Sequence, residues 1–232
     1  MKSLQHPTEP PPAGPSWEAG ERVTFGGLSD KGTGYMAYSE RAGPSVLLLH
    51  DGYGLLPSVE ELADGLVADG FTALAPDLYD GAVARTAQEA HTLFVALDED
   101  VVDKRLRAAA EHLTNNWHPR LGVIGFSMGA SLATRLARTI DLDATVVYYG
   151  GGAGLDEEWD SGPLLGHFAE DDASESAATA RRVMGSLDDG EVLVYRGCAH
   201  GFANSALNGA YDPAAAELAW SRTLEELHYQ LS

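Results

Sequence analysis

A serine held between two glycines is the residue of this sequence whose setting most directly indicates chemistry. Ser127 lies in V-I-G-F-S-M-G-A-S, residues 123–131, where an apolar run ends and a helical pattern begins. A G-x-S-x-G motif between a strand and a helix is typical of a nucleophile elbow, a tight turn that exposes the serine hydroxyl. Free N–H groups at the start of the helix favour negative charge that develops beside the serine. The alternative is that Ser127 merely starts a helix packed tightly on a sheet.

A serine hydroxyl needs a neighbouring base to act as a nucleophile. In this kind of fold the acid and then the histidine follow the serine along the chain, each after a later strand. His200 follows the predicted strand 191–196 and is the candidate base. Asp171 and Asp172 follow the preceding predicted strand, and the residue pattern leaves both open as the acid that orients the histidine. A serine, histidine and aspartate in this order predict acyl transfer to the serine.

The other histidines and the single cysteine fit structural roles better. His50 and His167 lie at predicted strand ends, where a histidine hydrogen-bonded within the core is expected. The remaining histidines fall in the N-terminal segment or on or beside predicted helices, where a solvated position is expected: His6, His91, His112, His118 and His228. Cys198 is expected to be a small buried residue rather than a second nucleophile. A lone cysteine excludes a disulfide within the chain.

Strands that alternate with helices must position these residues. The continuous apolar run over 45–50 is typical of a strand buried on both faces. The other predicted strands are 21–25 and 33–39, which form a hairpin, 71–78, 121–126, 144–150, 163–168 and 191–196. Helical patterns cover 58–70, much of 86–115, 128–138, the region near 175–186, and 212–227. This alternation predicts an α/β fold, a mostly parallel sheet of about eight strands with helices on both faces.

Three predicted helix ends rest on particular residues. Ser58 and Glu61 fit a capping box at the start of one helix, and Gly70 fits its C-terminal stop. Asp212 fits the N-cap of the closing helix, with Pro213 at the first helical position.

Composition limits the class of protein and its partners. The chain has 232 residues, 44% of them hydrophobic, and five of its 11 prolines fall within the first 15 residues. We expect a flexible proline-rich arm over 1–19 and a single domain over 20–232. A formal charge of −20, from 15 basic and 35 acidic residues, disfavours nucleic acid and anionic membrane surfaces as partners. With no secretory signal or transmembrane run recognised, a soluble cytoplasmic protein is expected.

Several short motifs in order resemble the dienelactone hydrolase family of α/β-hydrolases, from about Ser45 to the C-terminal helix. The motifs are L-L-L-H-D-G-Y-G-L (47–55), A-P-D-L-Y (75–79), G-F-S-M-G (125–129), Y-Y-G-G-G (148–152), G-H-F-A-E-D-D (166–172), A-H-G-F (199–202) and A-A-A-E-L-A-W-S-R-T-L (214–224). The resemblance implies the α/β-hydrolase fold, Ser127 as nucleophile, His200 as base and Asp172 as acid, with Asp171 as the alternative. It also implies an oxyanion hole formed by the backbone N–H groups of Met128 and Gly52.

The chain departs from the family's pattern at two positions. Serine stands at the elbow where the best-known members have cysteine, and Asp51 stands where they have glutamate. Serine cannot be stored as an anion, so that His200 must take its proton during attack. Asp51 either caps its loop or faces the substrate. Tyr53 and Arg85 are further candidate pocket residues, but Arg85 aligns poorly with the family's substrate-binding arginines, and a preference for anionic lactones is not supported.

The resemblance implies hydrolysis of a small-molecule carboxylic ester or lactone without metal or organic cofactor. A thioesterase or another acyl hydrolase would use the same three residues, and only a panel of substrates separates them. A non-catalytic ligand-binding protein of the same fold is the alternative from another class. The sequence leaves the oligomeric state and the identity of the substrate open.

Overall fold

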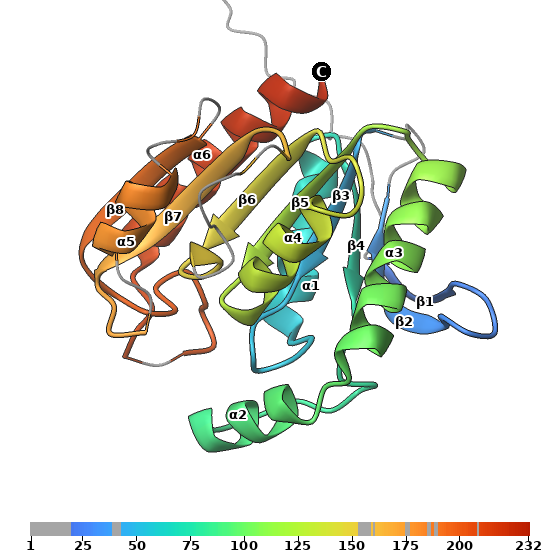
Figure 1. Cartoon of the computed structure of the whole chain (residues 1–232), viewed down its shortest axis with the longest axis horizontal. Helices are drawn as coiled ribbons and strands as arrows, with labels where there is room; N and C mark the ends of the chain where they lie inside the picture. Colours follow the sequence, from blue (N-terminus) through green and yellow to red (C-terminus); the bar gives the residue numbers. More distant parts are fainter. Residues whose placement is uncertain are drawn as a thin grey trace, which may run out of the picture.

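The computed structural model describes residues 20–38, 43–152, 159, 161–174, 177–184, 187, 190–207 and 209–232. The arm expected over 1–19 lies outside these residues. They contain an eight-stranded sheet with strand order β1-β2-β4-β3-β5-β6-β7-β8. Strand β2 is antiparallel to both of its neighbours, and every pair from β4 to β8 is parallel. The predicted α/β fold with a mostly parallel sheet is confirmed (Figure 1).

The eight strands include every predicted one, with some shifted ends. They are β1 (Glu21–Phe25), β2 (Gly32–Ala37), β3 (Ser45–Leu49), β4 (Thr72–Pro76), β5 (Leu121–Phe126), β6 (Ala144–Tyr148), β7 (Leu164–Asp171) and β8 (Gly190–Ala199). The predicted hairpin is formed by β1 and β2. The last two strands continue past their predicted ends, so that Asp171 is still paired, opposite Ala199.

Helices cover both faces of the sheet. One face is covered by α1 (Pro57–Ala68) and α6 (Pro213–Leu231), and the other by α3 (Glu99–Asn116), α4 (Met128–Ala137) and α5 (Ala177–Met184). The short helix α2 (Ala87–Val95) lies beyond the end of the sheet to which the parallel strands point (Figure 1).

Strand β3 shows why the central strands read as continuous apolar runs. Leu47 and Leu49 pack into the core beneath α3 and α4, whereas Val46 and Leu48 pack into the core beneath α1 and α6. All four side chains are fully buried. Because successive side chains of a strand point to opposite faces, a strand covered on both sides needs apolar residues at every position.

Helix α1 begins differently from the prediction. Pro57 occupies the first helical position and Leu56 is the N-cap, with no side-chain hydrogen bond to the helix. The capping box predicted for Ser58 and Glu61 is therefore wrong, because proline, whose φ is fixed near the helical value, starts the helix one residue earlier. At the other end Gly70 has a φ of 90°, the left-handed conformation of a C-terminal stop, as predicted.

Helix α6 begins as predicted and ends later. The Asp212 carboxylate accepts a hydrogen bond from the backbone N–H of Ala215 at 3.0 Å, and Pro213 is the first helical residue. The helix continues to Leu231, four residues beyond the predicted end at 227, because the buried Leu227 and Leu231 continue its apolar face.

Candidate active site

Ser127 lies in a strained turn between β5 and α4. Its φ of 50° and ψ of −109° are rarely adopted by residues other than glycine. A Cβ at Gly125 would clash with the carbonyl oxygen of Gly129, and a Cβ at Gly129 would clash with that of Leu49. A Cβ at Gly150 would likewise clash with the carbonyl oxygen of Ser127. The two glycines of the motif therefore allow the strand and the helix to approach as closely as an elbow requires.

The serine, the histidine and one aspartate form a continuous chain of hydrogen bonds. Ser127 Oγ lies 2.8 Å from His200 Nε2, and His200 Nδ1 lies 2.8 Å from Asp172 Oδ2. The Asp172 side chain is fully buried, whereas the imidazole is 34% exposed. The second carboxylate oxygen of Asp172 accepts the backbone N–H of Ser174 at 2.8 Å. A carboxylate fixed in this way keeps the hydrogen on Nδ1 and leaves Nε2 to accept a proton from the serine.

Only one of the two candidate acids reaches the histidine. Asp171 is the last residue of β7, is exposed, and follows an irregularity in the pairing of β7 with β8 between Ala169 and Asp171. Asp172 is the first residue past the strand and carries the hydrogen bond to His200. The geometry thus favours Asp172 over Asp171 as the residue that orients the imidazole.

A cavity of about 340 Å³ opens at Ser127 and His200. Gly52 and Met128, whose N–H groups are expected to form the oxyanion hole, both line it, and so do Asp51 and Tyr53.

Arg85, by contrast, is exposed, and it lies outside the described lining of this cavity. Its backbone N–H donates to the Glu89 side chain at 2.7 Å, at the start of α2. The structure does not bring the Arg85 side chain, a predicted pocket residue, to the site, because that segment of the chain is used to begin a helix.

Asp51 caps its loop and also faces the cavity. One carboxylate oxygen accepts the backbone N–H of Tyr53 at 2.8 Å, and the other accepts the Asn204 side-chain amide at 2.6 Å. The residue is only 5% exposed. Asp51 therefore joins the loop after β3 to the loop after β8, and it places a carboxylate beside the cavity.

His50 and Cys198 have structural positions, as expected. His50 is fully buried, its Nδ1 lies 2.6 Å from the Asp51 carbonyl oxygen, and its Nε2 accepts the backbone N–H of Leu78 at 3.2 Å. Burial lowers the pKa of His50, which favours the neutral ring with its hydrogen on Nδ1. Cys198 is 3% exposed, and burial raises the pKa of its thiol, which disfavours the nucleophilic thiolate.

His167 belongs to a buried polar network behind the site. Its Nδ1 lies 2.9 Å from the Tyr195 hydroxyl and its Nε2 lies 3.0 Å from Thr223 Oγ1. Burial, with a smaller contribution from the Arg222 cation, lowers the pKa of His167 to about 3. The Tyr148 hydroxyl lies 2.7 Å from the same Thr223 oxygen, so the network ties β6, β7 and β8 to α6. His167 is a hydrogen-bonded core histidine, as predicted.

Sequence reasoning did not single out Tyr149, which packs against the histidine of the site. Tyr149 follows β6 with a φ of 38°, is 1% exposed, and its ring meets the His200 ring edge-on at 5.1 Å between centroids. Its buried hydroxyl has no hydrogen-bond partner among the described residues. Burial, and then the charge of Asp51, raises its pKa well above the ordinary value. The sequence signal that could have indicated Tyr149 is its place at the carboxyl end of a parallel strand, where ligand sites lie.

Two residues of α2 were missed as well. His91, expected at a solvated position, is exposed but also lines the cavity, and Phe94 lines it beside His91. No pattern in the sequence indicates that α2 folds over the end of the sheet, so their place at the site depends on tertiary structure.

The described part of the chain holds neither a metal-ligand cluster nor a membrane-spanning helix. Among the described residues, no three His, Cys, Asp or Glu side chains lie close enough together to hold a metal ion. None of the described helices has the length and apolar character needed to cross a membrane.

Comparisons with known proteins identify the family to which the chain is similar. A family model described as "Dienelactone hydrolase family" matches residues 33–231. The chain is 31% identical over 222 residues to "Protein usf" of Aquifex pyrophilus, covering 88% of this chain and 96% of that protein. It is also 31% identical over 218 residues to a "Putative carboxymethylenebutenolidase" of Aquifex aeolicus, covering 87% and 94%.

A similar solved structure shows the same fold. It is the structure of a "Putative Dienelactone Hydrolase" from Klebsiella pneumoniae, and it superposes with a TM-score of 0.78 at 21% identity. The match covers 90% of this chain and 98% of that one.

Proposed function

The chain belongs to the dienelactone hydrolase family, and on this premise we propose that it is a serine hydrolase that cleaves carboxylic esters or lactones through an acyl-enzyme on Ser127. The observation that carries the proposal is the chain of two 2.8 Å hydrogen bonds from Ser127 through His200 to Asp172. A strained elbow holds the serine at one end, and a fully buried carboxylate lies at the other.

In the proposed reaction Ser127 Oγ attacks the carbonyl carbon of the substrate while His200 Nε2 takes the hydroxyl proton. Asp172 holds the imidazole and stabilises the imidazolium that forms. The backbone N–H groups of Met128 and Gly52 stabilise the oxyanion, each contributing about 3–4 kcal/mol of barrier lowering in such sites. His200 then protonates the leaving alcohol. Water, deprotonated by His200, attacks the acyl-enzyme and releases the carboxylic acid.

The serine fixes the order of proton transfer. A cysteine can be stored as a thiolate before substrate arrives, but the pKa of a serine hydroxyl is far too high for that. The serine must therefore lose its proton to His200 during attack, which requires Nε2 within hydrogen-bond distance. The distance of 2.8 Å meets this requirement.

The charge of the cavity bears on the class of ester. Asp51 brings a carboxylate to the cavity, while the Arg85 side chain lies outside its described lining. Since a substrate carboxylate would face a buried negative charge with no described Arg or Lys side chain to pair with it, we propose that uncharged esters and lactones are preferred over anionic ones.

The test is turnover of a small panel by wild type, Ser127→Ala and a matched control, Ser221→Ala, at an exposed serine on α6. The panel contains p-nitrophenyl acetate, an uncharged lactone and a lactone that carries a carboxylate. We expect Ser127→Ala to lose at least about 10³-fold in kcat, with its melting temperature within a few degrees of wild type. Ser221→Ala is expected to keep full activity. Ser127→Ala activity above a few per cent of wild type would exclude Ser127 as the nucleophile.

A further inference from the structure

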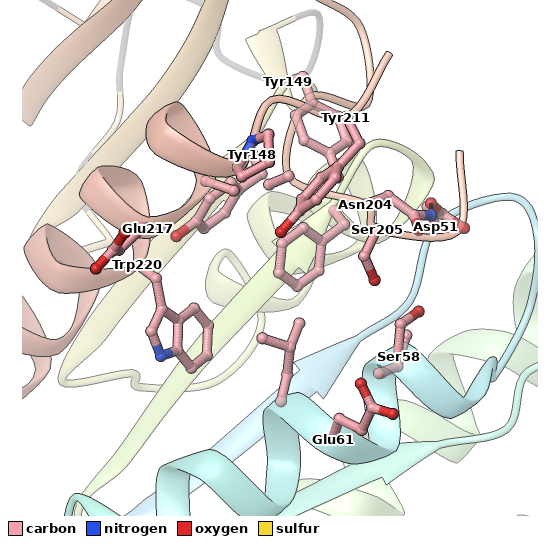
Figure 2. A pocket seen from close by; sticks show the side chains of 16 residues that line it. Asp51, Ser58, Glu61, Tyr148, Tyr149, Asn204, Ser205, Tyr211, Glu217 and Trp220 are labelled. Carbon is pink, nitrogen blue, oxygen red and sulfur yellow. Dashed lines mark hydrogen bonds between the residues drawn. The ribbon is translucent and has the colours of Figure 1, made fainter. Parts of the chain in front are cut away.

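A second cavity, of about 490 Å³, lies between α1 and α6. It shares Asp51 and Tyr149 with the cavity at Ser127. Figure 2 shows Ser58 and Glu61 reaching it from α1, Trp220 from α6 and Asn204 from the loop after β8. Glu217 of α6 also lines it, with its carboxylate turned away from the centre of the space. Neither Ser127 nor His200 is among its lining residues. Nothing in the proposed hydrolysis uses this space.

Its inner wall is aromatic and buried. Phe126, Tyr148 and Tyr149 are at most 5% exposed and line it; Phe126 ends β5, Tyr148 ends β6, and Tyr149 follows β6. Trp220 and the partly exposed Tyr211 complete the aromatic lining from α6 and the segment before it. A cavity of this size and lining can enclose the ring or alkyl group of a small ligand.

The charged part of the lining has one sign. Asp51, Glu61 and Glu217 all line the cavity, and none of its described lining residues is basic. Glu61 and Glu217 are exposed, and neither makes an ion pair with another described residue. In Figure 2 the Glu61 carboxylate is turned toward the space between α1 and α6. The mouth therefore attracts cations and repels anions.

One polar group in the wall lacks a partner. The Tyr149 hydroxyl is buried without a hydrogen bond among the described residues, although Tyr149 lines this cavity. A buried hydroxyl without a hydrogen bond destabilises a protein because it has lost its hydrogen bonds to water. Because this oxygen has almost no accessible surface, a ligand in the cavity would not contact it directly.

We propose that this second cavity binds an organic cation, an ammonium group attached to an aromatic or alkyl body. The faces of aromatic rings attract ammonium groups through their quadrupoles, and the tryptophan ring does so most strongly. Trp220 and Tyr211 supply such rings near the mouth, and Glu61 and Glu217 supply the opposite charge. The buried aromatic wall receives the apolar body of the ligand.

The proposed cation site is separate from the proposed catalytic cavity. Asp51 and Tyr149 border both cavities, and a hydrogen bond joins Asn204, which lines only the second cavity, to Asp51. The proposal therefore does not rest on the hydrolase function, and binding is measurable on protein that turns over no ester.

The test is calorimetric titration with phenyltrimethylammonium and with its neutral isostere tert-butylbenzene. We expect the cation to bind about three- to thirtyfold more tightly than the isostere, the range that a cation over aromatic rings produces. Trp220→Leu is expected to remove most of this preference. Glu217→Gln is expected to weaken cation binding about two- to fivefold and to leave the isostere unaffected. Glu225→Gln, an exposed acid on the same helix outside the cavity lining, is the matched control and is expected to change neither.

Three results would overturn the proposal. Equal affinity for the two compounds, or no binding of the cation at millimolar concentration, would show that the cavity does not recognise a positive charge. An equal loss in Glu217→Gln and Glu225→Gln would show general attraction to the acidic surface. Loss of cation binding after Ser127 is phosphonylated would place the cation in the first cavity. Thermal unfolding of Trp220→Leu and Glu217→Gln confirms that both remain folded during titration.

Discussion

Replacing Asp172 by asparagine tests how the imidazole is held. The Asp172 carboxylate lies 2.8 Å from His200 Nδ1, and its side chain is fully buried. An amide at this position can present its NH₂ group to Nδ1, which then becomes the acceptor. The hydrogen of the neutral ring moves to Nε2, the atom 2.8 Å from Ser127 Oγ. A protonated Nε2 cannot accept the serine proton, so the nucleophile loses its base.

The expected loss is large because the interaction is buried and direct. We expect Asp172→Asn to lower kcat about 10⁴-fold, the effect of the wrong tautomer in a serine triad, which corresponds to about 5.5 kcal/mol of barrier. Asp171→Asn is the matched control, since it removes the same charge one residue away at an exposed position, and less than a twofold change is expected. Initial rates with p-nitrophenyl acetate and melting temperatures are measured for both. Asp172→Asn activity above a tenth of wild type, or an equal loss in Asp171→Asn, would refute the reasoning.

Two further predictions concern the scaffold. Gly129→Ala is expected to lower the free energy of unfolding by about 1–3 kcal/mol or more, because the new methyl group clashes with the Leu49 carbonyl oxygen. Gly65→Ala has open space around the new methyl group and is expected to stabilise α1 by up to about 1 kcal/mol. Urea titration measures both, and equal stability of the two variants would contradict the clash. Burial lowers the pKa of His167 to about 3. Between about pH 6.5 and 3 the unfolded chain therefore binds a proton at His167 that the folded chain does not bind. The free energy of unfolding falls as the pH drops through this range, by up to about 1.4 kcal/mol per pH unit. Urea titrations across that range are expected to give a shallower pH slope for His167→Gln than for wild type, and equal slopes would contradict the shifted pKa.

The order and type of the strands could be predicted because burial on both faces leaves a direct pattern. The run over 45–50 is apolar at every position, and the structure places alternate residues of β3 in two separate cores. The ends of elements were less predictable. Pro57 overrode a capping box that the local sequence fits equally well, and the extension of β8 to Ala199 depends on pairing with β7. The local sequence offers two signals for the start of α1, Pro57 and the capping box, and does not decide between them, whereas the end of β8 depends on a strand distant in the sequence.

Some residues of the candidate site could likewise be predicted from the sequence, and others could not. Ser127 and His200 could be placed because chain order and the carboxyl ends of parallel strands bring them together. The choice between Asp171 and Asp172 depends on an irregularity in the pairing of β7 with β8, which the two adjacent acids do not encode. Tyr149 follows the carboxyl end of β6, which indicates a place near the site, but its contact with the His200 ring depends on tertiary packing.

The most direct test of the proposed nucleophile is intact-mass analysis after exposure to a fluorophosphonate, with peptide mapping of the adduct. The reagent marks a serine whose hydroxyl is activated by a neighbouring base. We predict a single adduct on Ser127 that is lost in Ser127→Ala and in His200→Ala. The absence of an adduct from the wild-type protein, or an adduct on another residue, would contradict the assignment of Ser127 as the activated serine.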